Sequence, residues 1–404
     1  MPWIMWCLAT LFFAYQFILR LSPGLMMNDI MTKFNVDATD YGYFASMYYY
    51  GYAIMQIPIA LLLDKCGPRS IISICAFVCA IATLTFVYAG QWYIAVLGRF
   101  LIGAASAVGF LGVSKVISMW FDSKDYGKMV AITFSVGLMG AVFGGKPVST
   151  LLDLFGWSEV LFYVALVSVL LGILILIFIR NPVQYIVKDN DKIINKLKIV
   201  CTDYRIIIIA LANLLLVGPL EGFADVWGVS YLMKAYEISR QDAASLTSFI
   251  FIGMIFGGPI LTFIAQKYNA YYSIAFLCGL LMSICFVLVI FYKQYFGFYT
   301  IMITMFIVGI CCCYQVLVFT IGALIMPVSL TGVTIAFLNC INMLGGSFFH
   351  TVIGRTLDFM WLGQEENDVR VYDLNSYSIA ISIIPLFCLV GGLMFLFIRR
   401  KSSS

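Results

Sequence analysis

The sequence predicts an all-α membrane protein with twelve transmembrane helices arranged as two six-helix bundles. Three observations lead to this fold class: the composition, a series of long apolar runs and an internal repeat. Of the 404 residues, 63% are hydrophobic and 11% are charged, and the mean hydropathy is +1.00. Soluble domains carry about 25% charged residues, so this chain cannot cover a water-exposed surface. Lipid must therefore supply much of its solvent.

Each apolar run is long enough to cross a bilayer, which takes about 20 residues in a helix. The predicted spans are 3–31, 40–63, 70–89, 92–119, 129–152, 159–179, 204–233, 240–265, 270–292, 298–326, 331–360 and 374–398. The first run has no preceding basic region and no small-residue cleavage site. We therefore expect it to be retained as a helix rather than removed as a signal peptide.

The basic residues of the loops predict the orientation, because cytoplasmic loops are enriched in Lys and Arg. One set of loops holds thirteen of them: Lys65, Arg69, Lys124, Lys128, Arg180, Lys188, Lys192, Lys196, Lys198, Lys267, Arg399, Arg400 and Lys401. The opposite set holds five: Lys33, Lys234, Arg240, Lys293 and Arg370. The richer side is expected to be cytoplasmic, with both termini.

The longest hydrophilic stretch lies between the sixth and seventh spans and divides the chain. We expect an N-terminal bundle over 1–180, a cytoplasmic linker over 181–203 and a C-terminal bundle with a short tail over 204–404. Within the linker, Lys192–Val200 fits either an interfacial amphipathic helix or a solvated segment.

The two halves repeat. Gly140 and Asp153 recur 205 residues later as Gly345 and Asp358, which places the fifth span on the eleventh. Such parallel repeats are related by an axis normal to the membrane, and substrate binds where they meet.

The loop between the second and third spans carries the sharpest motif. Its sequence from Ala60 to Arg69, A-L-L-L-D-K-C-G-P-R, resembles the loop signature of the major facilitator superfamily, with Ala60 in place of the first glycine. The resemblance implies that Asp64, Gly67 and Arg69 form a cytoplasmic gate, in which the carboxylate contacts a helix N-terminus and basic groups. The alternative is an ordinary charged turn.

The fourth and fifth spans carry two further motifs. Arg99 to Gly103 resembles the superfamily's fourth-helix motif, although Arg99 could instead snorkel to the outer interface. Gly140–Gly145 resembles the antiporter motif without its proline, which counts against exporter-type antiport. Lys115 is expected to snorkel to the inner interface rather than bind substrate.

Charged residues inside the spans are the main functional signal, since each costs at least ~2.5 kcal/mol to insert and normally faces a cavity or a partner. These residues are Arg20, Lys146, Glu221 and Asp225. The first three lie about 17 residues from the starts of their spans and could share one layer. Glu221 and Asp225 are four apart, on one face of an α-helix.

This set of charges suggests a site for a zwitterion. Arg20, alone or with Lys146, would hold a carboxylate, and Glu221 or Asp225 would hold an ammonium group or the coupling proton. Alternatively, Lys146 pairs structurally with one of these acids. His350, the only histidine, is a further proton candidate or a local hydrogen-bonding group. Further substrate-binding candidates are Tyr48, Gln56, Gln315, Asn339 and Asn342.

Several segments resemble the phagosomal-transporter (Pht) family of intracellular bacteria: Phe17–Pro23, Tyr48–Tyr52, Met55–Pro58 and Glu221–Gly228. The resemblance implies import of amino acids or nucleosides with protons. An arginine on the first helix also resembles organic-phosphate and organic-anion carriers, but the phosphate carriers pair it with a second arginine on the seventh helix. Here that helix carries acids, which favours a zwitterion.

We therefore expect a monomeric, proton-coupled importer of an amino acid or similar zwitterion in the inner membrane of a bacterium. Organic-anion, nucleoside and siderophore transport are the alternatives, and a non-transporting nutrient sensor is an alternative from another class. An enzyme is not expected, because the sequence lacks HExxH and GxSxG motifs. No cofactor, metal or nucleic-acid partner is expected.

Overall fold

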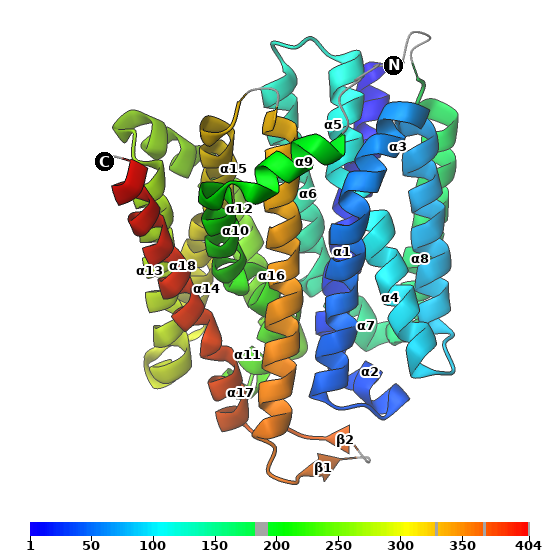
Figure 1. Ribbon diagram of the computed structural model, residues 1–404. Coiled ribbons are helices and arrows are strands. Elements are labelled where there is room, and N and C mark those ends of the chain that lie inside the picture. The colour runs from blue at the N-terminus through cyan, green and yellow to red at the C-terminus, as the bar shows by residue number, and fades with distance from the viewer. Residues whose placement is uncertain (182–192, 328–329, 367–368, 403–404) are drawn as a thin grey trace. The chain divides into compact units, whose positions relative to one another are not determined.

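The computed structural model describes residues 1–181, 193–327, 330–366 and 369–402, and nearly all of them are helical (Figure 1). In this part of the chain, eleven apolar helical stretches are long enough to cross a membrane. One of them, α3 (Ala38–Val87), is 50 residues long and contains two predicted spans joined at Gly67. The expected all-α fold with twelve spans is confirmed in this form.

Gly67 separates the two spans of α3 by its backbone conformation. Its φ of 78° and ψ of 163° lie outside the helical region, in a conformation that costs glycine little. Pro68 follows directly and starts the next helix, since proline is tolerated in a first turn. The sequence Gly67-Pro68 therefore turns the chain within a very short loop.

Contacts between Cα atoms divide the chain into two compact units, Met1–Phe34 with Met47–Lys188, and Asn35–Ser46 with Asp189–Ser404. Besides most of α3, the first unit holds α1 (Pro2–Leu25), α2 (Met27–Phe34), α4 (Trp92–Ser106), α5 (Val108–Trp120), α6 (Tyr126–Gly144), α7 (Lys146–Phe155) and α8 (Trp157–Phe178).

The second unit begins with α9 (Ile193–Thr202), which occupies the end of the predicted linker; residues 182–192 lie outside the described part. It continues with α10 (Tyr204–Leu216), the π-helix η1 (Gly218–Trp227), α11 (Gly228–Tyr236), α12 (Arg240–Tyr268), α13 (Tyr271–Phe291), the 3₁₀ turn η2 (Lys293–Tyr295), α14 (Phe298–Cys312), α15 (Tyr314–Ile325), α16 (Thr331–Phe359), α17 (Leu374–Ile381) and α18 (Ile383–Ser402). Between α16 and α17, two antiparallel strands of two residues each pair with one another: β1 (Glu365–Glu366) and β2 (Val369–Arg370).

Several spans that the sequence predicts as single helices are interrupted. The break between α4 and α5 is slight, because Ala107 keeps a right-handed helical conformation. The break at Gly145 is larger, with φ −86° and ψ −110°. Hydropathy does not detect such breaks, since apolar residues continue on both sides. The interruptions lie at Met26, Ala107, Gly145, Val217, Cys313 and Ser382.

Glycines let the helices of the first unit approach closely. A Cβ atom on Gly140 would lie 2.0 Å from the carbonyl oxygen of Ala14, so α6 packs against the backbone of α1. A Cβ on Gly103 would lie 1.9 Å from the carbonyl oxygen of Tyr48, so α4 meets α3 in the same way. Small residues serve this purpose in membrane helices, where van der Waals packing drives association.

The start of α3 packs on α16 within the second unit. A Cβ on Gly42 would lie 2.4 Å from the carbonyl oxygen of His350, and one on Gly354 would lie 2.3 Å from that of Ala38. Ser46 adds a hydrogen bond of 3.0 Å from its Oγ to the carbonyl oxygen of Ser347. These contacts explain why Asn35–Ser46 groups with the C-terminal half of the chain.

Candidate functional site

In the first unit, the buried side chain of Arg20 lies against two aromatic rings. Its guanidinium carbon lies 5.4 Å from the ring centroid of Tyr49 and 5.8 Å from that of Phe17. Both distances lie within the range of cation–π attraction. The N–H donors of the guanidinium point outward in its plane, where they match the two oxygens of a carboxylate. Arg20 can therefore bind an anion.

Arg99 fixes the backbone that carries Arg20. Its Nη1 donates to the carbonyl oxygen of Leu19 at 2.7 Å, and its Nη2 donates to the carbonyl oxygen of Arg20 at 2.9 Å. The carbonyl of Leu19 lacks its usual helical donor, because that donor would be the missing N–H of Pro23. Arg99 is 2% exposed, so it does not snorkel to the outer interface. It supports the position of Arg20.

Gln16 lies one helical turn before Arg20 and was not predicted from the sequence. It is buried, and its Nε2 makes no hydrogen bond within the described part of the chain. A Cβ atom on Gly109 of α5 would lie 1.8 Å from Gln16 Oε1, so only glycine leaves room for this amide. The spacing of four residues from Arg20 was the available signal, because such pairs share a helix face.

The other predicted residues of the first unit have different surroundings. Tyr48 is buried, and its ring centroid lies 4.7 Å from the guanidinium carbon of Arg99. Gln56, two turns further along α3, is also buried. Lys146 is exposed and begins α7, directly after the break at Gly145. Tyr48 thus belongs with Arg20 and Arg99, whereas Lys146 does not share their burial.

In the second unit, Glu221 and Asp225 lie on η1, and both are buried. The α-helix predicted for this segment is wrong, because a π-helix is bonded from residue i to i+5. That the two acids share one face stays a prediction. Pro219 lacks an N–H, and glycine at 218 and 222 allows close contact with the ring of Phe349. π-Helical turns are rare and often mark functional sites.

Asn342 on α16 is one hydrogen-bond partner of Glu221. Its Nδ2 donates to Oε1 of Glu221 at 3.2 Å, and both residues are about 1% exposed. Asn339 on the same helix and Gln315 on α15 are half-buried. His350, two turns beyond Asn342, is fully buried.

Two further polar residues of this unit were missed by the sequence reasoning. The hydroxyl of Tyr314 donates to the carbonyl oxygen of Asn213 at 3.1 Å, and Asn213 Nδ2 donates to the carbonyl oxygen of Leu338 at 3.4 Å. These bonds connect α15 to α10 and α10 to α16. No motif indicated them, since isolated Asn and Tyr residues in apolar runs carry no spacing signal.

The predicted gate residues lie at the turn within α3. Asp64 pairs with Lys115 of α5, with 2.6 Å between Oδ1 and Nζ. Arg69 instead donates from Nε to the carbonyl oxygen of Leu176 at 2.8 Å. Gly67 lies against Asn181, whose Nδ2 donates to the carbonyl oxygen of Cys66 at 3.1 Å. The basic partner of Asp64 is therefore Lys115, which was expected only to snorkel.

Within the described residues, no group of three or more His, Cys, Asp or Glu side chains could hold a metal ion. The buried charges of the two units instead include the guanidinium of Arg20 and the carboxyl groups of Glu221 and Asp225. Such groups can bind polar solutes and exchange protons.

Comparison with known proteins identifies the family of this chain. The family model of the Major Facilitator Superfamily matches residues 5–350. This chain belongs to the Major Facilitator Superfamily. It is therefore a multi-pass membrane protein of the secondary-transporter type.

Curated relatives from this superfamily match part of the chain. The probable galactarate/D-glucarate transporter GudP of Escherichia coli (strain K12) is 27% identical over 188 residues, which cover 45% of this chain and 42% of that protein. The putative metabolite transport protein NicT of Pseudomonas putida is 31% identical over 178 residues, or 41% of this chain and 39% of that one. The chain thus spans about two-fifths of the length of the curated relatives it matches.

Solved superfamily structures resemble the whole chain in fold. A bacterial homologue of the human lysosomal transporter Spinster has a TM-score of 0.74 at 15% identity and covers 98% of this chain and 96% of its own. The nucleoside transporter NupG has a TM-score of 0.77 at 14% identity and covers 99% of both chains. At these identities the likeness demonstrates a shared fold.

Proposed function

We propose that this transporter imports a small zwitterion such as an amino acid, coupled to protons, by alternating access in a bacterial inner membrane. The observation that carries the proposal is that each unit buries one polar centre, and that the two centres differ in sign. The first centre is Arg20, and the second is Glu221 with Asp225. In transporters built from two repeats, the substrate binds near the bilayer midplane at the repeat interface.

The first centre supports recognition of a carboxylate. Buried arginines in membrane-spanning helices often mark a substrate pathway. Arg99 holds the backbone of Arg20 through two carbonyl groups, and the rings of Tyr49 and Phe17 lie within cation–π distance of its guanidinium. Such a fixed, planar donor group is preorganised for two parallel hydrogen bonds to a carboxylate.

The second centre supports binding of an ammonium group or a proton. The amide of Asn342 can serve both protonation states of Glu221, because Nδ2 donates to the carboxylate and Oδ1 can accept from the carboxylic acid. Oδ1 makes no hydrogen bond within the described residues. A buried carboxyl group with such a neighbour can take up and release a proton without losing its partner.

A second candidate substrate class is a small organic anion. Relatives named as probable galactarate/D-glucarate transporters favour it. Arg20 would again bind a carboxylate, but Glu221 and Asp225 would then carry only protons. Both candidates require Arg20 and differ in the need for an amino group on the substrate. The resemblance to the Pht family stays a prediction, and nucleosides are a third class to include in any screen.

Uptake into proteoliposomes with an alkaline interior tests the proposal. We expect the gradient to drive uptake of the true substrate from a panel of amino acids, sugar diacids and nucleosides. Arg20→Ala should abolish uptake, whereas the control Lys124→Ala, an exposed loop cation, should retain it. Glu221→Gln should keep substrate exchange but lose acceleration by the gradient. Unchanged uptake in Arg20→Ala would refute the site, and preference for sugar diacids would select the organic-anion alternative.

A further inference from the structure

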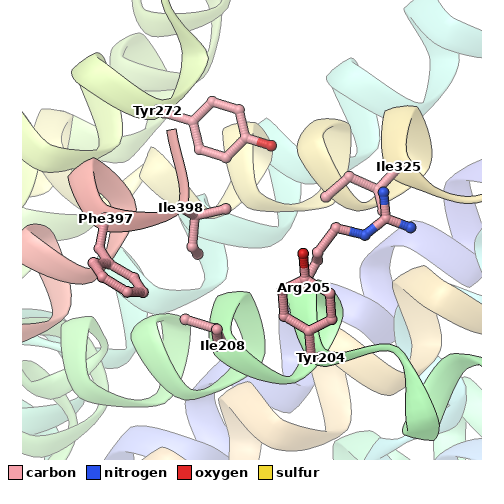
Figure 2. A pocket seen from close by; sticks show the side chains of 7 residues that line it. All are labelled: Tyr204, Arg205, Ile208, Tyr272, Ile325, Phe397 and Ile398. Carbon is pink, nitrogen blue, oxygen red and sulfur yellow. The ribbon is translucent and has the colours of Figure 1, made fainter. Parts of the chain in front are cut away.

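A cavity of about 220 Å³ lies within the second unit, away from Glu221 (Figure 2). It is bordered by the ends of four helices. Tyr204 and Arg205 start α10, and Tyr272 is the second residue of α13. Ile325 ends α15, and Phe397 lies near the end of α18. Helix starts and helix ends therefore meet on one side of the membrane. The loop charges predict that this side is cytoplasmic.

One half of the cavity wall is polar. Arg205 forms a two-pronged pair with Asp203, with 3.1 Å from Nε to Oδ1 and 2.7 Å from Nη2 to Oδ2. Asp203 also accepts the backbone N–H of Arg205 at 2.8 Å, as the N-cap of α10, which fixes the guanidinium in place. No hydrogen bond within the described residues uses Nη1. Figure 2 shows the hydroxyls of Tyr204 and Tyr272 directed into the space that Arg205 borders.

The other half is apolar and accessible from outside. It consists of Ile208, Ile325 and Phe397, with Ile398 beside them. Phe397 is 56% exposed and Tyr204 is 57% exposed, although both lie at the ends of apolar spans. Side chains so placed in a membrane protein meet acyl chains and headgroups. An amphiphile with a polar head and a hydrocarbon tail matches this division of the wall.

The charge around the cavity selects the sign of the head. Arg205 is the one charged residue among the described residues that line the cavity, and in the sequence Ile398 is followed by three basic residues, Arg399-Arg400-Lys401. The cytoplasmic leaflet is anionic, and each nearby basic residue contributes about 1 kcal/mol to binding it. Guanidinium groups bind phosphate through paired N–H donors.

We propose that this cavity binds an anionic phospholipid of the surrounding leaflet. The phosphate contacts Arg205 and the two tyrosine hydroxyls, and the first part of an acyl chain lies on Ile208, Ile325 and Phe397. This site is separate from the transport site, so the inference does not depend on the proposed substrate.

Native mass spectrometry of the detergent-purified protein tests the site, with phosphatidylglycerol and phosphatidylcholine of identical chains as probes. We expect retention of phosphatidylglycerol in preference to phosphatidylcholine. Arg205→Gln should weaken phosphatidylglycerol binding about fivefold, the effect of one basic group. Ile325→Trp, which fills the cavity but keeps Arg205, should reduce retention of both lipids. The control Lys293→Gln removes a cation at the opposite helix ends and should change nothing.

Excess inorganic phosphate distinguishes a lipid site from a phosphate site. A lipid site needs the acyl chain, so phosphate should not displace phosphatidylglycerol. Three results would overturn the proposal. They are displacement of phosphatidylglycerol by phosphate, equal retention of the two lipids by the wild type, and undiminished phosphatidylglycerol binding by both Arg205→Gln and Ile325→Trp. Thermal unfolding of each variant without added lipid separates lost binding from lost folding.

Discussion

Tyr372 donates a hydrogen bond from its phenolic hydroxyl to Asp358, and together they cap the start of α3. The hydroxyl accepts the backbone N–H of Ala38 at 3.0 Å, and the carboxylate accepts that of Thr39 at 2.6 Å. The first N–H groups of a helix have no partners inside it. Here side chains from α16 and the segment before α17 supply them.

Tyr372→Phe should therefore destabilise the second unit. The variant leaves the N–H of Ala38 without its acceptor and removes a donor to Asp358, and loss of a helix cap typically costs about 1 kcal/mol. Thermal unfolding in detergent measures the effect. The matched control is Tyr295→Phe, since Tyr295 is 75% exposed in η2 and should be neutral. Equal melting temperatures for the two variants would contradict the capping role.

Gly103→Ala should prevent normal packing of α4 on α3. The added Cβ would lie 1.9 Å from the carbonyl oxygen of Tyr48, and a backbone atom cannot move aside as a flexible side chain can. Overpacking of this kind costs about 1–3 kcal/mol or more. Size-exclusion profiles and unfolding of the purified variant report the damage. Gly90→Ala is the control, because no atom lies within 4 Å of the Cβ it would add. A monodisperse, wild-type-like Gly103→Ala protein would show that the helices can separate freely.

Asp64 and Lys115 should be weakly coupled, and the coupling should depend on salt. Their carboxylate and ammonium groups are 2.6 Å apart but partly exposed, and such pairs contribute about 0.2–1 kcal/mol. A double-mutant cycle with Asp64→Asn and Lys115→Met measures this term at low and high ionic strength. The exposed pair Lys124–Asp122, at 3.3 Å, gives a comparison that should be nearer zero. A coupling that high salt leaves intact would mean that the Asp64 pair is shielded from solvent.

The sequence predicted the number of spans and the turn at Gly67 because hydropathy and glycine act locally. It also selected Arg20, Glu221 and Asp225, since charges inside apolar runs are conspicuous. The sequence did not predict which residues these charged groups contact. Lys115 lies 51 residues from Asp64, and Asn342 lies 121 residues from Glu221, so only the packing of helices brings them together.

Local geometry accounts for the remaining differences. The π-helix at Gly218–Trp227 escaped prediction because hydrophobicity does not distinguish bonding to i+4 from bonding to i+5. The role of Arg99 was missed because it depends on the missing N–H of Pro23, in a helix 80 residues earlier.

The pairing of Asp203 with Arg205 predicts a pH dependence of stability. Hydrogen bonding from Arg205 holds the pKa of the Asp203 carboxyl below its ordinary value, despite the opposing effect of partial burial. Because the folded-state pKa is depressed, the stabilisation is complete above the unfolded value of about 3.9. It is lost as the pH falls through the folded-state pKa.

The difference in unfolding free energy between wild type and Asp203→Asn should therefore stay constant from pH 7 to about pH 5 and shrink below about pH 4. Denaturation of the purified proteins at these pH values measures it. Asp122→Asn, in an exposed loop, is the control and should show little difference at any pH. A difference that grows on acidification would reverse the sign of the assigned shift.

Because the π-helix η1 has more residues per turn than an α-helix, the direction in which the side chains of α11 point depends on the number of residues in η1. Deleting one residue between Gly218 and Trp227 could let the segment relax into an ordinary α-helix with its backbone bonds intact. The rotation and the rise per residue of an α-helix both differ from those of a π-helix, so the position of every residue after the deletion relative to α10 would change. Insertions and deletions in this segment should therefore be far less tolerated in related genes than substitutions that keep its length.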